Sequence, residues 1–263
     1  MQLLSFLSQP TMHAYILPLQ ENVVSKLYKK MAPLEYVRWA VAVAGLVGGG
    51  GNVAEGLKHL EATLPHVQAS AGSGAAAVAE QDEQAILLLQ LEITRRQLSS
   101  GADSDAIKTR LADSKRGLDH YSGVMDARVY AAYYQAMYEY SKLSGNPQEY
   151  YTNSLLYLTY TPLADIAPQT RQALASDIGL AALLGANIYN FGELLQHPIL
   201  ASLDGTEYAW LPKMLQAFNA GNIPEFNSIF DTVKGKYVSH TWTHDDARVE
   251  EGSSEYERCV AVV

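Results

Sequence analysis

The chain has 263 residues, 48% hydrophobic and 18% charged, which suits one large globular domain or two small ones. Its 19 lysines and arginines against 28 aspartates and glutamates give a net charge of −9, which disfavours binding to nucleic-acid phosphates. The single cysteine, Cys259, excludes an intrachain disulfide and a structural zinc site built on several cysteines.

Apolar residues recur at helical spacing through most of the chain, starting after Pro33. The first expected helix spans residues 34–47 and stops at a run of four glycines, Gly48 to Gly51. Asn52 is expected to cap a second helix, whose apolar positions continue to Leu64. Two short helices joined by a glycine turn form a helical hairpin.

The rest of the chain continues the helical pattern with short interruptions. Residues 69–79, composed mostly of alanine, serine, glycine and valine, are expected to form a flexible insert. Helical order is expected to resume near Glu80 and to stop at Gly101, and Ser104 is expected to cap the next helix. In the helix that Ser104 caps, the residues expected to face inward are Ile107, Leu111 and Leu118. The later expected helices are residues 126–143, 148–160, 170–184, 191–196, 198–203, 207–219 and 224–233.

Strand signals are nearly absent, because β-branched clusters are rare and no two-residue hairpin turn separates alternating runs. Helix pairs follow one another at roughly the 34–47-residue spacing of helical repeats. The sequence therefore predicts an all-α fold, a right-handed stack of TPR-like helical hairpins in which each pair covers its neighbour. After residue 233 the composition becomes polar without an amphipathic period, which predicts an irregular, disordered tail over residues 234–263.

The glycine run supports one alternative, a nucleotide-binding enzyme that uses the Gly48 to Gly51 loop. Residues 41–47 would then form a buried strand, and the glycines would cover a pyrophosphate at a helix N-terminus. The acidic residue that this motif needs about 20 positions later is missing, and no further strand–helix–strand units follow. A glycine-rich turn between two helices is the favoured interpretation.

Other candidate chemistry is weak. His240 and His244 lie four residues apart beside two aspartates and could bind zinc or nickel, but a solvated tail is the favoured interpretation. The chain contains no nucleophile-elbow or phosphate-loop motif. No stretch approaches the roughly 18 apolar residues of a membrane span. We therefore expect no catalytic residue, cofactor-binding residue or metal ligand, and a protein that is not an enzyme.

The most distinctive segment spans residues 190–200, where Asn190 and Glu193 predict a capping box on a one-turn helix and Pro198 begins the next helix. Together with its flanks it resembles the family of the 26S proteasome non-ATPase regulatory subunit 13, which belongs to the PCI proteins of the proteasome lid. The resemblance covers most of residues 20–233 and is specific over residues 179–222. The positions that carry it are Asn190, Phe191, Gly192, Glu193, Leu194, Leu195, His197, Pro198, Trp210, Phe218 and Gly221.

This resemblance implies an N-terminal helical-repeat arm over residues 1–168, the helical part of a PCI module over 169–233, and an atypical tail over 234–263. It implies a scaffold role in the proteasome lid, supporting lid assembly and ubiquitin-dependent degradation, in the cytoplasm and nucleus. The implied partners are other lid subunits in a hetero-oligomer, with no cofactor, nucleic acid or membrane. A free helical-repeat adaptor is the alternative.

The family's winged helix and C-terminal helix are not recognisable after residue 233, so we expect weaker lid binding than a form that carries them. The residues expected to pack together as the core of the PCI helical part are Leu183, Leu184, Phe191, Leu194, Leu195, Trp210, Leu215 and Phe218.

Overall fold

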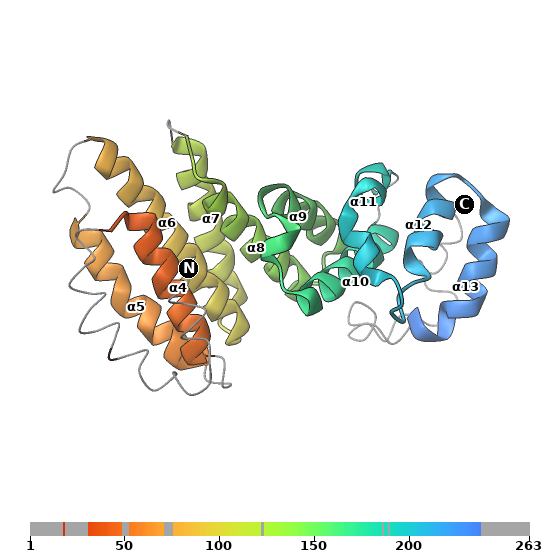
Figure 1. The fold of residues 1–263 in the computed structure, drawn as a ribbon, viewed down its shortest axis with the longest axis horizontal. Coiled ribbons are helices and arrows are strands. Elements are labelled where there is room, and N and C mark those ends of the chain that lie inside the picture. The colour runs from red at the N-terminus through yellow and green to blue at the C-terminus, as the bar shows by residue number, and fades with distance from the viewer. Residues whose placement is uncertain are drawn as a thin grey trace. The chain divides into compact units, whose positions relative to one another are not determined.

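The computed structural model describes residues 18, 31–48, 53–70, 76–121, 124–185, 187–188 and 190–237. Within these ranges the regular elements are all helices (Figure 1). Within each unit helices pack against their neighbours, as α4 does on α5 and α9 on α10, so the predicted all-α stack of helices is confirmed. The chain divides into two compact units, Met1–Ala136 and Met137–Val263.

The first unit contains α4 (Pro33–Gly48), α5 (Val53–Ser70), α6 (Ala76–Ser99) and α7 (Ser104–His120). Helix α4 packs against α5 and α6, and α6 also packs against α5 and α7. Small residues let α4 and α5 approach closely, since a Cβ atom added at Gly56 would lie 2.6 Å from the backbone oxygen of Ala44. The predicted first hairpin is therefore present, with a glycine at the crossing of its two helices.

Residues 41–47 are helical within α4, so the strand required by the nucleotide-binding alternative is wrong. Apolar β-branched residues occur there because that face of α4 is covered by other helices, and burial outweighs intrinsic propensity. The predicted turn glycines after Gly48, and Asn52 as a cap, lie outside the described residues.

The predicted flexible insert over residues 69–79 is wrong at both of its ends. Helix α5 continues to Ser70, and α6 already begins at Ala76 rather than near Glu80. Alanine has the highest helix propensity of any residue, so an alanine-rich run can extend a helix despite its low complexity. The predicted cap at Ser104 is also wrong, because the side chain of Asp103 accepts a hydrogen bond from the Asp105 N–H at 3.3 Å.

Helix α8 (Ala127–Leu143) crosses the boundary between the two units, and α9 (Pro147–Tyr160) follows it. The predicted break between them is confirmed. Gly145 adopts a φ of +67°, in the left-handed region that favours glycine. The Asn146 side chain then accepts from the Glu149 N–H at 3.2 Å, which caps α9.

The second unit is completed by a set of mostly shorter helices. In chain order they are η4 (Leu163–Asp165), α10 (Pro168–Leu184), α11 (Gly192–Gln196), η5 (Pro198–Leu203), α12 (Leu211–Asn219) and α13 (Ile223–Tyr237). Helix α10 is central, because it packs against α9, η5 and α12, and its residues from Leu174 to Ala182 are all buried. At Gly179, a Cβ atom would lie 2.5 Å from Cδ2 of Leu211 on α12.

Two boundaries in this unit differ from the sequence prediction by more than two residues. Helix α12 begins at Leu211 rather than at Glu207. The residues before it form turns closed by hydrogen bonds between residues three positions apart, such as that from the Leu211 N–H to the Tyr208 carbonyl at 2.9 Å. Helix α13 continues to Tyr237, so the predicted disordered tail is wrong for residues 234–237. The remaining tail, with His240, His244 and Cys259, lies outside the described residues. The expected domain boundary at residue 168 stays a prediction.

Candidate functional site

The predicted signature segment begins in the second unit, directly before α11. Asn190 Oδ1 accepts a hydrogen bond from the Gly192 N–H at 2.8 Å, and Phe191 occupies the N-cap position. The predicted capping box from Asn190 to Glu193 is therefore wrong, because Asn190 lies one residue too early to cap the helix. Its side chain instead makes a local turn with the backbone two residues later.

Phe191 anchors this segment to α12. Its side chain is fully buried, and its ring centroid lies 4.9 Å from that of Phe218. The Phe191 N–H donates to Asn219 Oδ1 at 3.2 Å, so the backbone and the ring are both tied to the end of α12. Leu194, one turn further on, is also fully buried. The signature thus fixes a short helix against its neighbour.

His197 and Pro198 join α11 to η5. The Ile199 N–H donates to Nδ1 of His197 at 3.2 Å, so the imidazole caps η5, and Pro198 starts that helix as predicted. Burial lowers the pKa of His197, and the Glu193 carboxylate partly opposes this by favouring the protonated form. A neutral imidazole is the form that can accept this backbone hydrogen bond.

Two further signature residues, Trp210 and Phe218, belong to an aromatic cluster of α12 and α13. Met214, Ala217 and Phe226 are buried, and Trp210 and Phe218 pack against them half-buried. The Phe226 and Phe230 rings stack with centroids 6.3 Å apart and an interplanar angle of 7°. Gly221, with φ of +66°, makes the turn between the two helices.

Three of the eight residues predicted as the core of this region are buried, namely Phe191, Leu194 and Leu215. The other five are half-buried: Leu183, Leu184, Leu195, Trp210 and Phe218. Leu183 also packs on the aromatic cluster. Of the signature positions, Phe191, Leu194, Trp210 and Phe218 therefore pack against neighbouring helices of this unit.

A partly buried polar cluster in the same unit was not predicted. Lys142 Nζ lies 2.5 Å from Asp177 Oδ2, and the Tyr150 hydroxyl donates to the same carboxylate oxygen at 3.3 Å. Burial raises the pKa of Tyr150 well above its usual value, and the charge of Asp177 adds to the effect. The three residues come from α8, α10 and α9, so the cluster ties three helices together.

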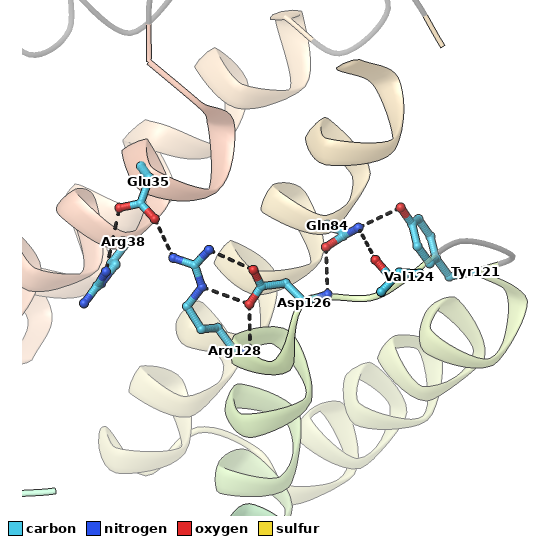
Figure 2. A network of polar contacts seen from close by, with 7 residues as sticks. All are labelled: Glu35, Arg38, Gln84, Tyr121, Val124, Asp126 and Arg128. Atoms are coloured by element: carbon cyan, nitrogen blue, oxygen red, sulfur yellow. Dashed lines mark hydrogen bonds and ion pairs between the residues drawn. The ribbon is translucent and has the colours of Figure 1, made fainter. Parts of the chain in front are cut away.

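A second polar network lies in the first unit, around the start of α8 (Figure 2). Arg128 donates to both oxygens of Asp126, from Nε at 2.9 Å and Nη2 at 2.8 Å. Its third nitrogen, Nη1, donates to Glu35 Oε1 at 2.6 Å, and Glu35 lies in the first turn of α4. The hydrogen bonds from Arg128 hold the pKa of Asp126 below its usual value.

Gln84 on α6 completes this network by holding the segment that leads into α8. Its side-chain amide donates to the Tyr121 hydroxyl at 2.7 Å and to the Val124 carbonyl at 3.2 Å. Its amide oxygen accepts from the Asp126 N–H at 3.0 Å (Figure 2). Gln84 is buried, and these three bonds satisfy both ends of its amide.

In the ranges that the structure describes, no group of three or more His, Cys, Asp or Glu side chains is arranged to hold a metal ion. None of the helices in those ranges is both long enough and apolar enough to cross a membrane. The two polar networks described above each connect residues of different helices.

Comparison with known families agrees with the helical stack. The family described as PSD13 N-terminal repeats matches residues 1–215. The chain belongs to this family. The match includes most of the signature segment, and it confirms the resemblance predicted from residues 179–222. Phe218 and Gly221 lie beyond the matched range, and a special role for the signature positions stays a prediction.

Several known proteins are similar to this chain in sequence. The 26S proteasome non-ATPase regulatory subunit 13 homolog A of Arabidopsis thaliana is 43% identical over 127 residues, 48% of this chain and 33% of that protein. The 26S proteasome regulatory subunit RPN9 of Saccharomyces cerevisiae is 33% identical over 218 residues, 81% of this chain and 54% of that protein. The Dictyostelium discoideum subunit 13 is 30% identical over 214 residues, 79% of this chain and 50% of that protein. The chain thus spans about half the length of these relatives, or less.

Proposed function

We propose that this chain is a non-catalytic scaffold subunit of the 26S proteasome regulatory particle, in its lid. The observation that carries the proposal is membership of the PSD13 N-terminal repeat family, whose relatives are named as non-ATPase regulatory subunits of the 26S proteasome. As a lid scaffold, the chain supports lid assembly and thereby the degradation of ubiquitinated proteins.

The fold supports this role because helical-repeat stacks expose long continuous surfaces on which other proteins can dock. Two clusters of polar side chains join helices, one of them formed by Lys142, Tyr150 and Asp177. The proposed partners are other lid subunits in a hetero-oligomer, with no cofactor. The net charge of −9 disfavours nucleic acid as a partner.

The proposed location is the cytoplasm and nucleus. Fluorescence microscopy of cells that express the tagged chain at low level tests it. Signal in both compartments is expected, and retention on a membrane-bound organelle would contradict the proposal.

The scaffold role is tested by affinity purification of the tagged chain, with co-purifying lid subunits quantified by mass spectrometry. We expect lid subunits to be enriched over a tagged helical-repeat protein of unrelated sequence. A chimera that joins residues 1–237 to the part of the yeast relative beyond its matched region is expected to recover more of them. If neither the chain nor the chimera enriches lid subunits, the scaffold proposal is wrong.

A folding control keeps this test specific. Gly179→Leu places a large side chain where a single Cβ already lies 2.5 Å from Leu211, so it should disrupt the packing of α10 on α12. If recovery of lid subunits depends on the folded repeats, this variant recovers fewer of them than the unchanged chain. Equal recovery would indicate that the enrichment does not come from the repeat stack.

A further inference from the structure

The ion pair between Arg128 and Glu35 joins helices that are far apart in the stack. Glu35 lies in α4, the first helix of the first described pair, whereas Arg128 lies at the start of α8, after the pair formed by α6 and α7. The two residues are 93 positions apart in the sequence. In a helical-repeat stack each repeat normally contacts only its neighbours, so a bond that passes over one helix pair is unusual.

The geometry of Arg128 makes this bond part of a continuous chain of contacts. Two nitrogens of its guanidinium bind Asp126 in a fork, and the remaining Nη1 binds Glu35 (Figure 2). The Asp126 N–H in turn donates to Gln84 on α6. The planar guanidinium can serve two carboxylates at once because its five N–H donors point in fixed directions. Helices α4, α6 and α8 are thereby joined through Arg128 and Asp126.

These charges are also open to the solvent. The side chains of Arg128 and Glu35 are 39% and 49% exposed, and that of Asp126 is 28% exposed. Dissolved ions can therefore reach the charges, and at about 0.5 M salt the screening length is only a few ångströms. A partly exposed pair loses strength under these conditions, whereas the buried amide of Gln84 does not depend on charge.

We propose that Glu35, Arg128 and Asp126 form an ionic strap that holds the start of α8 against α4 and makes this attachment sensitive to ionic strength. At low salt the strap is closed, and the first turns of α4 and α8 protect each other from opening. At high salt the strap weakens, and α8 remains attached through Gln84 and its apolar contacts. The strap is a device of the fold and does not depend on which subunits the chain contacts.

Each acidic residue of the strap also has a local role that must be separated from it. Glu35 in the first turn of α4 is favourable for that helix by itself, because carboxylates stabilise helix N-termini. Asp126 accepts from the Arg128 N–H at 2.9 Å, which caps the start of α8. A local effect stays within the helix that carries the residue, whereas a strap transmits it to the other helix.

The test is amide hydrogen exchange of the full chain, measured by mass spectrometry at about 0.05 M and 0.5 M NaCl. Glu35→Gln is expected to speed exchange in the first turn of α8 by roughly two- to fivefold at low salt, the range typical of exposed ion pairs. Arg128→Gln is expected to do the same in the first turn of α4. In the first turn of α4, the double variant should exchange no faster than Arg128→Gln alone, because both changes remove the same ion pair between Glu35 and Arg128.

Two control variants are matched to these changes. Arg38→Gln removes the 3.7 Å contact of Arg38 with Glu35 but leaves Arg128 in place, so exchange in α8 should stay unchanged. Arg116→Gln removes an ion pair with Asp113 within α7, and should affect neither first turn. At 0.5 M salt the difference between Glu35→Gln and the unchanged chain should shrink towards none.

Three outcomes would contradict the strap. Glu35→Gln could change exchange in α4 alone, or the effects of Glu35→Gln and Arg128→Gln on exchange could add in the double variant. The third is that the exchange difference between Glu35→Gln and the unchanged chain persists at about 0.5 M salt. Because Glu35→Gln keeps the bond between Arg128 and Asp126, it gives a clear result even if Arg128→Gln loosens the first unit as a whole.

Discussion

Three glycines in helices provide a graded test of the described packing, because the structure surrounds them differently. A Cβ atom at Gly117 on α7 would meet only two methyl carbons of Leu87, at 3.8 and 3.9 Å. At Gly179 it would overlap Leu211, with Cδ2 at 2.5 Å and Cγ at 2.9 Å. At Gly56 it would lie 2.6 Å from the backbone oxygen of Ala44, which cannot rotate away.

The expected changes in the free energy of unfolding follow from these distances. Glycine to alanine within a helix gains about 1 kcal/mol from propensity, and Gly117→Ala should keep most of that gain. Overpacking costs about 1–3 kcal/mol, so Gly179→Ala should end near neutral or destabilised by up to about 2 kcal/mol. Gly56→Ala must push α4 and α5 apart, and a net loss of about 2 kcal/mol or more is expected.

Thermal melting followed by circular dichroism at 222 nm measures these effects. At about 2–4 °C per kcal/mol for a chain of this size, Gly117→Ala should raise the Tm by about 2–4 °C. Gly56→Ala, in the same unit, should lower it by about 4–8 °C. If Gly56→Ala melts at or above the unchanged chain, α4 and α5 do not cross as described. If Gly117→Ala lowers the Tm, the space described around Gly117 is wrong.

Three further predictions concern side chains. Phe191→Ala should cost about 3–5 kcal/mol by urea unfolding, because the ring is fully buried against Phe218, and an unchanged midpoint would contradict its core position. Lys142→Met should lower the free energy of unfolding by about 1.5–3 kcal/mol, because it removes a charged hydrogen bond to Asp177. The loss should lie towards the lower end of that range because the Lys142 side chain is 35% exposed. An unchanged free energy of unfolding in the same assay would show that the ion pair is dispensable. The pKa of Asp126 lies below its usual 3.8, so the stability that this carboxylate contributes is present above that pH and is lost as the pH falls through the lowered pKa. Asp126→Asn should therefore make the free energy of unfolding less dependent on pH below about pH 4. An unchanged pH dependence would contradict the pairing of Asp126 with Arg128.

Much of the fold could be predicted because local sequence signals mark where helices begin and end. Gly145, Asn146 and Pro147 mark the end of α8 and the start of α9 through turn and cap chemistry, and the structure confirms that break. The start of α6 at Ala76 was missed because alanine is both the commonest residue of low-complexity runs and the best helix former. Local composition does not separate these two cases, whereas packing against α5 and α7 does.

The polar clusters could not be predicted for a different reason. Lys142 and Asp177 are 35 positions apart, and Glu35 and Arg128 are 93 apart, so no spacing rule connects them. A charged residue on an amphipathic helix is expected to be solvated, and only the stacking of the helices brings these pairs together. By contrast, the start of η5 at Pro198 could be predicted from the proline alone.

The position of the unit boundary inside α8 affects how the chain can be divided for experiments. A helix is cooperative, and a fragment of only two turns has too few internal hydrogen bonds to persist by itself in water. Cutting after Ala136 would separate Lys142 from the part of α8 that precedes it and leave the helix with a frayed new end. A fragment of the second unit that begins at Ala127 should therefore fold more cooperatively than one that begins at Met137. The fragments of this protein that fold by themselves are therefore expected to begin and end at the ends of whole helices.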